Sequence, residues 1–81
     1  MKTEVLLFAS LKDLARADRI SVELADHACV SDLLASISSQ HPILEERLSL
    51  TRVAIDDRFA APEDLIPPGA EIALIPPVSG G

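Results

Sequence analysis

A chain of 81 residues is the size of one small domain, and its 48% hydrophobic content is enough for a packed core, which excludes a disordered tail. Seven lysines and arginines against thirteen aspartates and glutamates give a net charge of -6, so the surface would repel a phosphate backbone and we expect no nucleic-acid partner. The single cysteine excludes an internal disulfide, and without a leader-like segment or an apolar run of about 18 residues we expect a cytoplasmic chain that does not contact membranes.

The first part of the chain predicts two strands joined by a short helix. Residues 3–9 are apolar on both alternating faces after Glu4, which is typical of a central strand. Residues 11–17 place apolar side chains at helical spacing and predict a short helix or a wide connection. Apolar and polar residues alternate over 20–24, which predicts a second strand that runs antiparallel to the first.

The middle of the chain predicts the main helix. The Ser-Asp pair at 31–32 can cap a helix by accepting hydrogen bonds from its first free amides, and an apolar stripe follows over residues 31–40. The helix should end at His41, because Pro42 pushes the preceding residue out of the helical region. Residues 43–50 predict a second short helical turn that lays its leucines on the core.

The last part predicts a hairpin and a final strand. Residues 51–60 alternate on either side of an Asp-Asp turn at 56–57. The Pro-Pro-Gly sequence at 67–69 predicts a reverse turn, since proline fixes one dihedral angle and glycine tolerates a positive one. Residues 71–75 then form an apolar inner strand.

This order of elements predicts an α+β fold. If the first and last strands lie side by side at the centre, they run parallel, and the intervening helix supplies the right-handed crossover. We therefore expect a β-grasp domain over residues 1–75, with a mixed sheet crossed by one main helix, followed by an extended C-terminal diglycine tail over residues 76–81.

The tail is the segment that points to chemistry. Pro76 and Pro77 have no amide hydrogen, so they cannot continue sheet pairing, and their restricted φ keeps the exit extended. At roughly 3.3 Å per residue the tail can reach about 20 Å, enough to enter a partner's active site. Gly80 and Gly81 carry no Cβ and can pass a narrow channel.

The reactive group would be the main-chain carboxylate of Gly81. A carboxylate is a poor electrophile until it is activated, for example as an acyl-adenylate formed with ATP. The chain contains neither a P-loop nor a dinucleotide-binding motif, so an activating partner would have to bind the ATP. We expect no cofactor bound to the chain itself.

Three segments resemble the small subunits of molybdopterin synthase, which are ubiquitin-like sulfur carriers: Val-Leu-Leu-Phe-Ala-Ser-Leu at 5–11, Pro-Gly-Ala-Glu-Ile-Ala-Leu-Ile at 68–75 and Pro-Pro-Val-Ser-Gly-Gly at 76–81. The resemblance covers essentially the whole chain, and the Pro-Pro-Val-x-Gly-Gly ending is its most specific part. It implies that a ubiquitin-activating-like adenylyltransferase activates Gly81, which becomes a thiocarboxylate. The tail would then enter the large synthase subunit and donate sulfur to a pterin precursor for the molybdenum cofactor. The complex would hold two small, non-catalytic subunits and two large ones.

The resemblance also implies roles for particular residues. Gly81 would hold the transferable sulfur as its thiocarboxylate. The expected partner-binding positions lie in the tail and on an apolar surface of the body: Gly80, Ser79, Val78, Pro77, Pro76, Ile75, Phe59 and Phe8. One departure is Asp56, where relatives commonly have asparagine, and an ionised aspartate accepts hydrogen bonds but cannot donate them.

Simpler interpretations exist for several of these residues. Terminal glycines can be a frayed end, and Phe8 and Phe59 can be core residues, because aromatic side chains bury a large area. We expect Cys29 to be a small buried hydrophobe rather than a nucleophile. His27 and His41 lack the spacing of a metal site, so we expect no metal.

Three other functions share the same features. A thiamine-pathway sulfur carrier has the same fold and ending, although the longer body and the Pro-Pro-Val-Ser sequence favour the pterin route. A protein modifier would conjugate Gly81 to lysines. A noncovalent β-grasp adaptor would make no chemical use of its tail.

Overall fold

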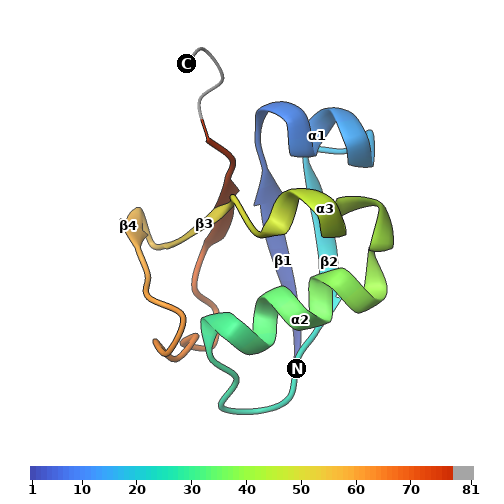
Figure 1. Cartoon of the computed structure of the whole chain (residues 1–81). Helices are drawn as coiled ribbons and strands as arrows, with labels where there is room; N and C mark the ends of the chain where they lie inside the picture. The colour runs from blue at the N-terminus through green and yellow to red at the C-terminus, as the bar shows by residue number, and fades with distance from the viewer. Residues whose placement is uncertain (78–81) are drawn as a thin grey trace.

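A mixed five-stranded sheet with the strand order β2-β1-β5-β3-β4 forms the centre of the computed structural model, which describes residues 1–77 (Figure 1). The elements in chain order are β1 (Lys2–Leu7), α1 (Ala9–Ala15), β2 (Arg19–Glu23), α2 (Val30–Gln40), a 3₁₀ turn η1 (Pro42–Leu44), α3 (Glu45–Leu48), β3 (Arg52–Ile55), β4 (Arg58–Phe59) and β5 (Ile72–Ile75). Every predicted strand and helix is present. The chain has the predicted α+β, β-grasp architecture.

The first and last strands lie side by side at the centre of the sheet. β1 and β5 run parallel, with Val5 opposite Ile72 and Leu7 opposite Leu74. β2 pairs with the other edge of β1, and β3 pairs with both β5 and β4, all antiparallel. The predicted central placement of the terminal strands is confirmed, and β5 is held on both sides.

The core lies between α2 and one face of the sheet, and Figure 1 shows α2 crossing that face. The buried residues of α2 recur at helical spacing and meet alternate residues of the strands: Val30, Leu33, Ile37, Val5, Leu7, Ile20, Val22, Val53, Ile72 and Leu74. Burying one such aliphatic side chain stabilises the fold by roughly 1.5–3 kcal/mol. Successive strand residues point to opposite faces, so this core leaves a second sheet face for other contacts.

The N-terminus of α2 differs from the prediction. Cys29, not the Ser-Asp pair, precedes the helix in extended backbone, and Asp32 sits in the first turn. The Asp32 carboxylate accepts a hydrogen bond from the Cys29 amide at 3.0 Å. The amides of Val30 and Ser31 are satisfied by the carbonyls of Asp64 and Pro62, at 2.9 Å each, so Ser31 is not needed as a cap.

Cys29 is partly exposed, which contradicts its prediction as a buried hydrophobe. Its place before the helix explains this, because its thiol lies 3.4 Å from the Asp32 carboxylate rather than in the core. The Cys29 amide, followed by the thiol, holds the pKa of Asp32 below its usual value.

The edge of β2 is covered by side chains from the end of α2. The side-chain amide of Gln40 makes two hydrogen bonds to the backbone of Glu23. Its Nε2 donates to the Glu23 carbonyl at 3.0 Å, and its Oε1 accepts from the Glu23 backbone amide at 2.9 Å. His41 Nε2 lies 2.9 Å from the Ser21 carbonyl, which can only accept. These contacts occupy backbone groups that an exposed edge strand would otherwise offer to another chain.

The predicted core placement of the leucines in residues 43–50 is correct for two of the three. Leu44 and Leu48 are buried, but Ile43 and Leu50 are 61% and 68% exposed. Residues four apart share one face of a helical turn, so Leu44 and Leu48 point inward together while the other two do not.

Both predicted turns are confirmed and are tied to each other. Asp56 and Asp57 have φ of 49° and 68°, as a two-residue hairpin turn requires, and Gly69 has φ of 77°. Asp56 Oδ1 accepts from the Glu71 amide at 2.9 Å, and the Asp56 amide donates to the Glu71 carbonyl at 2.8 Å. Asp56 therefore acts as an acceptor, a role that a carboxylate oxygen fills as well as an asparagine oxygen does.

Candidate functional site

Apolar side chains form a row across four strands on the sheet face that α2 does not cover. In the strand register Leu6 lies opposite Ala73, which lies opposite Ala54, which in turn lies opposite Phe59. Residues directly opposite each other share one face of a sheet. Together with Phe8 and Ile75, these four line a shallow hollow of about 270 Å³, and we call the six residues the open face.

The aromatic residues of the open face are not core residues. Phe59 is 56% exposed on the short edge strand β4, and Phe8 is 46% exposed just beyond β1. The Arg52 guanidinium lies 3.8 Å from the centre of the Phe59 ring. Aromatic surface left uncovered on one sheet face makes this face the candidate for contact with another protein.

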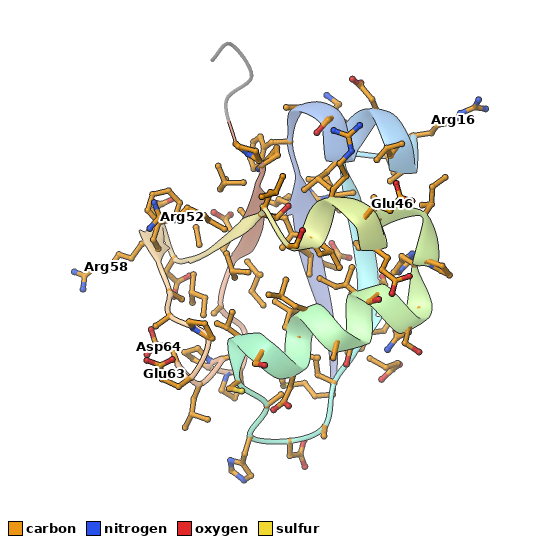
Figure 2. The ribbon with its side chains drawn as sticks, viewed as in Figure 1. Arg16, Glu46, Arg52, Arg58, Glu63 and Asp64 are labelled. Atoms are coloured by element: carbon orange, nitrogen blue, oxygen red, sulfur yellow. The ribbon has the colours of Figure 1, made fainter. Side chains whose placement is uncertain are left out.

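Acidic residues lie at one end of the open face. Asp57 and Glu71 line the same hollow, beside the Asp56 turn. Figure 2 shows that Arg58 points away from the hairpin, while Glu63 and Asp64 gather on the loop that follows β4. The acidic end of the open face favours a partner with basic side chains at that position.

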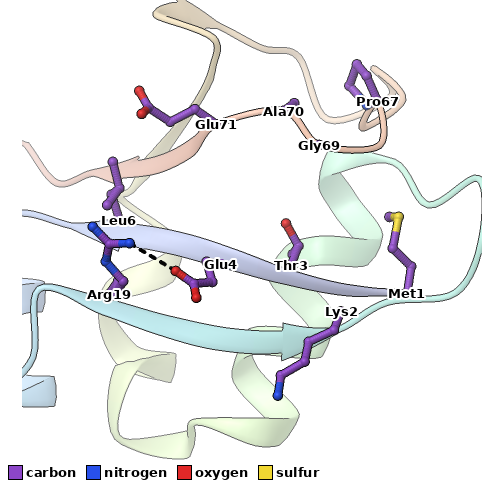
Figure 3. A pocket seen from close by; sticks show the side chains of 10 residues that line it. All are labelled: Met1, Lys2, Thr3, Glu4, Leu6, Arg19, Pro67, Gly69, Ala70 and Glu71. Atoms are coloured by element: carbon purple, nitrogen blue, oxygen red, sulfur yellow. Dashed lines mark hydrogen bonds and ion pairs between the residues drawn. The ribbon is translucent and has the colours of Figure 1, made fainter.

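A polar hollow of about 350 Å³ adjoins the open face at the other end of β1 (Figure 3). Leu6 and Glu71 line both hollows. Glu4 and Arg19 form an ion pair of 3.0 Å inside it, and both side chains are largely exposed, so the pair adds little stability. This hollow lies where β1 begins, and β5 runs parallel to β1, so the end of β5 at Ile75 lies toward the opposite end of the sheet. The hollow is therefore separate from the start of the tail.

The strand β5 delivers the chain from the open face to the tail. Strand pairing ends with Ile75 opposite Arg52, and Pro76 and Pro77 follow. Ile75, Phe8, Pro76 and Pro77 also line a second groove of about 740 Å³. Its remaining walls come from α1 and from the segment at the end of α3: Ala9, Ser10, Asp13, Arg47 and Leu50. We call it the tail-root groove.

The structure brings the predicted body residues Phe8, Phe59 and Ile75 to one hollow, and the tail residues Pro76 and Pro77 to the adjoining groove that Phe8 and Ile75 also line. The other predicted site residues, Val78, Ser79, Gly80 and Gly81, lie outside the described residues. Among the described residues that line the open face and the tail-root groove there is no histidine, lysine or cysteine. Within residues 1–77 there is also no cluster of three or more potential metal ligands, and no helix has the length and hydrophobicity to span a membrane.

Sequence reasoning missed eight residues of these surfaces: Leu6, Ala54 and Ala73 of the open face, and Ala9, Ser10, Asp13, Arg47 and Leu50 of the tail-root groove. A signal for the first three was present, because their segments 5–9, 53–55 and 72–75 are apolar at every position. One alternate set fills the core, so the other set needs a cover of its own. The exposed Leu50 gave no such signal, since a leucine at helical spacing also fits the core.

Comparisons with known proteins agree on one family. Residues 5–81 match the model of the ThiS family. The chain is 36% identical to the molybdopterin synthase sulfur carrier subunit of Chlamydomonas reinhardtii, covering 100% of both chains. It is 34% identical to small archaeal modifier protein 1 of Haloferax volcanii, over 93% of this chain and 95% of that protein.

Solved structures give the same result. The crystal structure of SAMP1 from Haloferax volcanii superposes with a TM-score of 0.87, at 32% identity and 100% coverage of both chains. A chain in the complex of subunits 1 and 2 of molybdopterin-converting factor from Helicobacter pylori superposes with a TM-score of 0.69, at 27% identity and 100% coverage of both.

Proposed function

The chain belongs to the ThiS family, and from this membership we propose that it is a sulfur carrier that serves as the small subunit of a molybdopterin synthase. The full-length similarity to a molybdopterin synthase sulfur carrier subunit supports this function over the other carriers. The structural observation that best supports this function is the open face, where two aromatic side chains are exposed. Ile75 belongs to the same face, and the tail begins at the next residue, Pro76.

The proposed chemistry takes place on the carboxylate of Gly81. In the partner adenylyltransferase, a carboxylate oxygen attacks the α-phosphorus of ATP, and pyrophosphate leaves. Hydrosulfide then attacks the acyl carbon of this adenylate and displaces AMP, which gives the thiocarboxylate directly. If the donor is a persulfide, the attack gives an acyl disulfide, and a thiol cleaves its S–S bond, releasing the thiocarboxylate and taking the donor's sulfur into a new disulfide. The large synthase subunit would hold the site at which this sulfur passes to a pterin precursor. The carrier supplies the sulfur atom and the extended tail that brings it to a partner's active site, while the partners supply the catalytic groups.

The body contributes by aiming the tail. β5 is paired on both sides, so the position of Ile75 is fixed relative to the open face. The two prolines that follow have restricted φ, which lowers the entropy lost when the tail is held in a partner's channel. A partner that docks on the open face would therefore receive the tail in a defined direction.

The proposed partner is the large subunit, in a complex of two small and two large subunits. The Helicobacter pylori relative is seen in a complex of subunits 1 and 2, which supports an assembly of this kind. The acidic rim of the open face adds the expectation that the large subunit places basic residues beside Asp57 and Glu71.

An intact-mass experiment tests this function. The chain is incubated with ATP, a sulfur source and its activating enzyme, and the mass should rise by the replacement of one oxygen atom with sulfur. Addition of the large subunit and the pterin precursor should restore the original mass. A variant that lacks Gly81 is the control and should never gain sulfur. An unchanged mass for the complete chain, with an activating enzyme that is active on another carrier, refutes the proposal.

Conjugation to proteins is the second candidate function, favoured by the similarity to small archaeal modifier protein 1. A modifier would appear as covalent adducts of other proteins, linked from Gly81 to lysine and resistant to reducing agents. The same reaction mixtures separate the remaining alternatives. A thiamine-pathway carrier gains sulfur but does not pass it to the pterin precursor, and a noncovalent adaptor forms neither product.

A further inference from the structure

The tail-root groove adjoins the open face, and the two surfaces share part of their walls. Phe8 and Ile75 line both of them. A partner that covers these two residues on the open face therefore already touches the rim of the groove. The outer wall of the groove, formed by Arg47 and Leu50, belongs neither to the open face nor to the tail.

The open face alone is small for a stable complex. From Leu6 on β1 to Phe59 on β4 it spans three strand spacings, or about 14 Å. A stable specific interface buries about 800 Å² on each partner, which is several times the area of such a strip. The partner must contact more of the surface, and the groove is the adjoining apolar area.

Leu50 is the most exposed of the large hydrophobic side chains in residues 1–77, at 68%. Its backbone is nevertheless held in place. The Leu50 amide donates to the Arg47 carbonyl at 3.3 Å, and the Thr51 hydroxyl donates to the same carbonyl at 2.6 Å. Leu44 and Leu48 already supply the buried contacts of this segment, so core packing does not explain Leu50.

Arg47 supplies a charge to the same wall. The described residues contain two ion pairs, Lys12 with Asp18 and Arg19 with Glu4, and Arg47 takes part in neither. In a chain with a net charge of -6, this cation stands beside an exposed leucine without a carboxylate within 4.0 Å among residues 1–77. A guanidinium in this position can pair with a partner carboxylate in a two-point contact.

We propose that the large subunit holds the tail root from both sides. One of its surfaces covers the open face, and a second segment, which carries an apolar side chain next to a carboxylate, fills the tail-root groove. The apolar side chain packs on Leu50, and the carboxylate pairs with Arg47. This inference rests on the proposed function, because it assumes that the large subunit is the partner on the open face.

Two variants and two matched controls test the inference by calorimetric titration with the large subunit. Leu50→Ser and Arg47→Glu should each weaken binding about tenfold or more, since each removes a contact that is buried only in the complex. Ile43→Ser removes an equally exposed hydrophobic side chain outside the groove. Arg16→Glu reverses the charge of a different arginine, whose side chain projects away from the molecule (Figure 2). Both controls should bind within about twofold of the wild type.

Two further measurements keep the outcomes distinct. Arg47→Glu should reduce the salt dependence of binding, whereas Arg16→Glu should not. The rate of sulfur loading by the activating enzyme should be the same for Leu50→Ser and the wild type. Normal binding of both groove variants overturns the inference, and so does slow loading of Leu50→Ser with normal binding to the large subunit. The proposed function survives either result, but it fails if the wild-type chain neither gains sulfur nor binds the large subunit.

Discussion

Replacement of Phe59 by alanine tests the open face most directly. A phenylalanine offers about 200 Å² of surface, of which 56% is exposed here, so a partner can cover about 110 Å² of it. At about 25 cal/mol per Å² this contact is worth about 2.8 kcal/mol, close to the 2 kcal/mol or more of a typical interface anchor. We expect Phe59→Ala to weaken binding to the large subunit by roughly 30- to 100-fold.

The same change should have little effect on the fold. Phe59 is outside the buried core, and its defined contact is with the Arg52 guanidinium, an exposed interaction worth about 0.5–1 kcal/mol. Urea denaturation should therefore show a loss of no more than about 1 kcal/mol in the free energy of unfolding. The expected effect is a separation of binding from stability.

The assay is calorimetric titration of the large subunit, with Ile43→Ala as the control. Ile43 is 61% exposed but lies outside both surfaces at the tail root, so its truncation should leave affinity unchanged. If Phe59→Ala binds as tightly as Ile43→Ala, Phe59 is not part of the interface. If it unfolds as readily as a core truncation, its assignment to a surface is wrong.

Three further predictions concern the body. Leu74→Ala should lower the free energy of unfolding by about 2–5 kcal/mol in urea denaturation, because Leu74 is fully buried, whereas Ile75→Ala should mainly weaken partner binding. Gln40→Ala should cost roughly 1–2 kcal/mol, from its two hydrogen bonds to Glu23, and should promote self-association in light scattering, because the edge of β2 is then uncovered. Asp32→Asn should change the acid limb of a stability profile. The folded pKa of Asp32 is lowered, so the stability that its carboxylate contributes is present at neutral pH and is lost as pH falls through that pKa. The gap between Asp32→Asn and wild type should therefore narrow below about pH 4.

Matched variants separate these effects from general damage. Ser39→Ala changes an exposed neighbour of Gln40 and should leave association unchanged. Asp26→Asn removes an exposed carboxylate outside the helix and should leave the acid limb as in the wild type. An Asp32→Asn profile parallel to that of the wild type at every pH would contradict the role given to the Cys29 amide.

Local sequence patterns were sufficient to predict the structure of those segments whose conformation does not depend on distant contacts. Alternation over residues 20–24 and the Pro-Pro-Gly turn at 67–69 needed no distant contact to be interpreted correctly. The predicted cap at the start of α2 was wrong, because residues distant in the sequence determine how the helix begins. Cys29 forms an isolated bridge with Leu65, and loop carbonyls more than thirty positions away satisfy the first amides of the helix.

The candidate site likewise contains residues that the sequence could identify and residues that only the structure revealed. Phe59 was proposed from the resemblance to a known family, whereas Leu50 was assigned to the core because hydrophobicity alone does not tell a core residue from a partner contact. The register of the sheet resolved the open face, since Leu6, Ala73, Ala54 and Phe59 come from four separate segments of the chain.

The central position of β5 has a mechanical consequence. A force applied to the C-terminus acts along the axis of β5, and the hydrogen bonds to β1 and β3 lie across that axis. They are therefore loaded together in shear and must rupture as a group, rather than one after another as when a strand is peeled from an edge. Traction on the tail, as when a partner releases it from a tight channel, would be borne at once by the hydrogen bonds on both sides of β5.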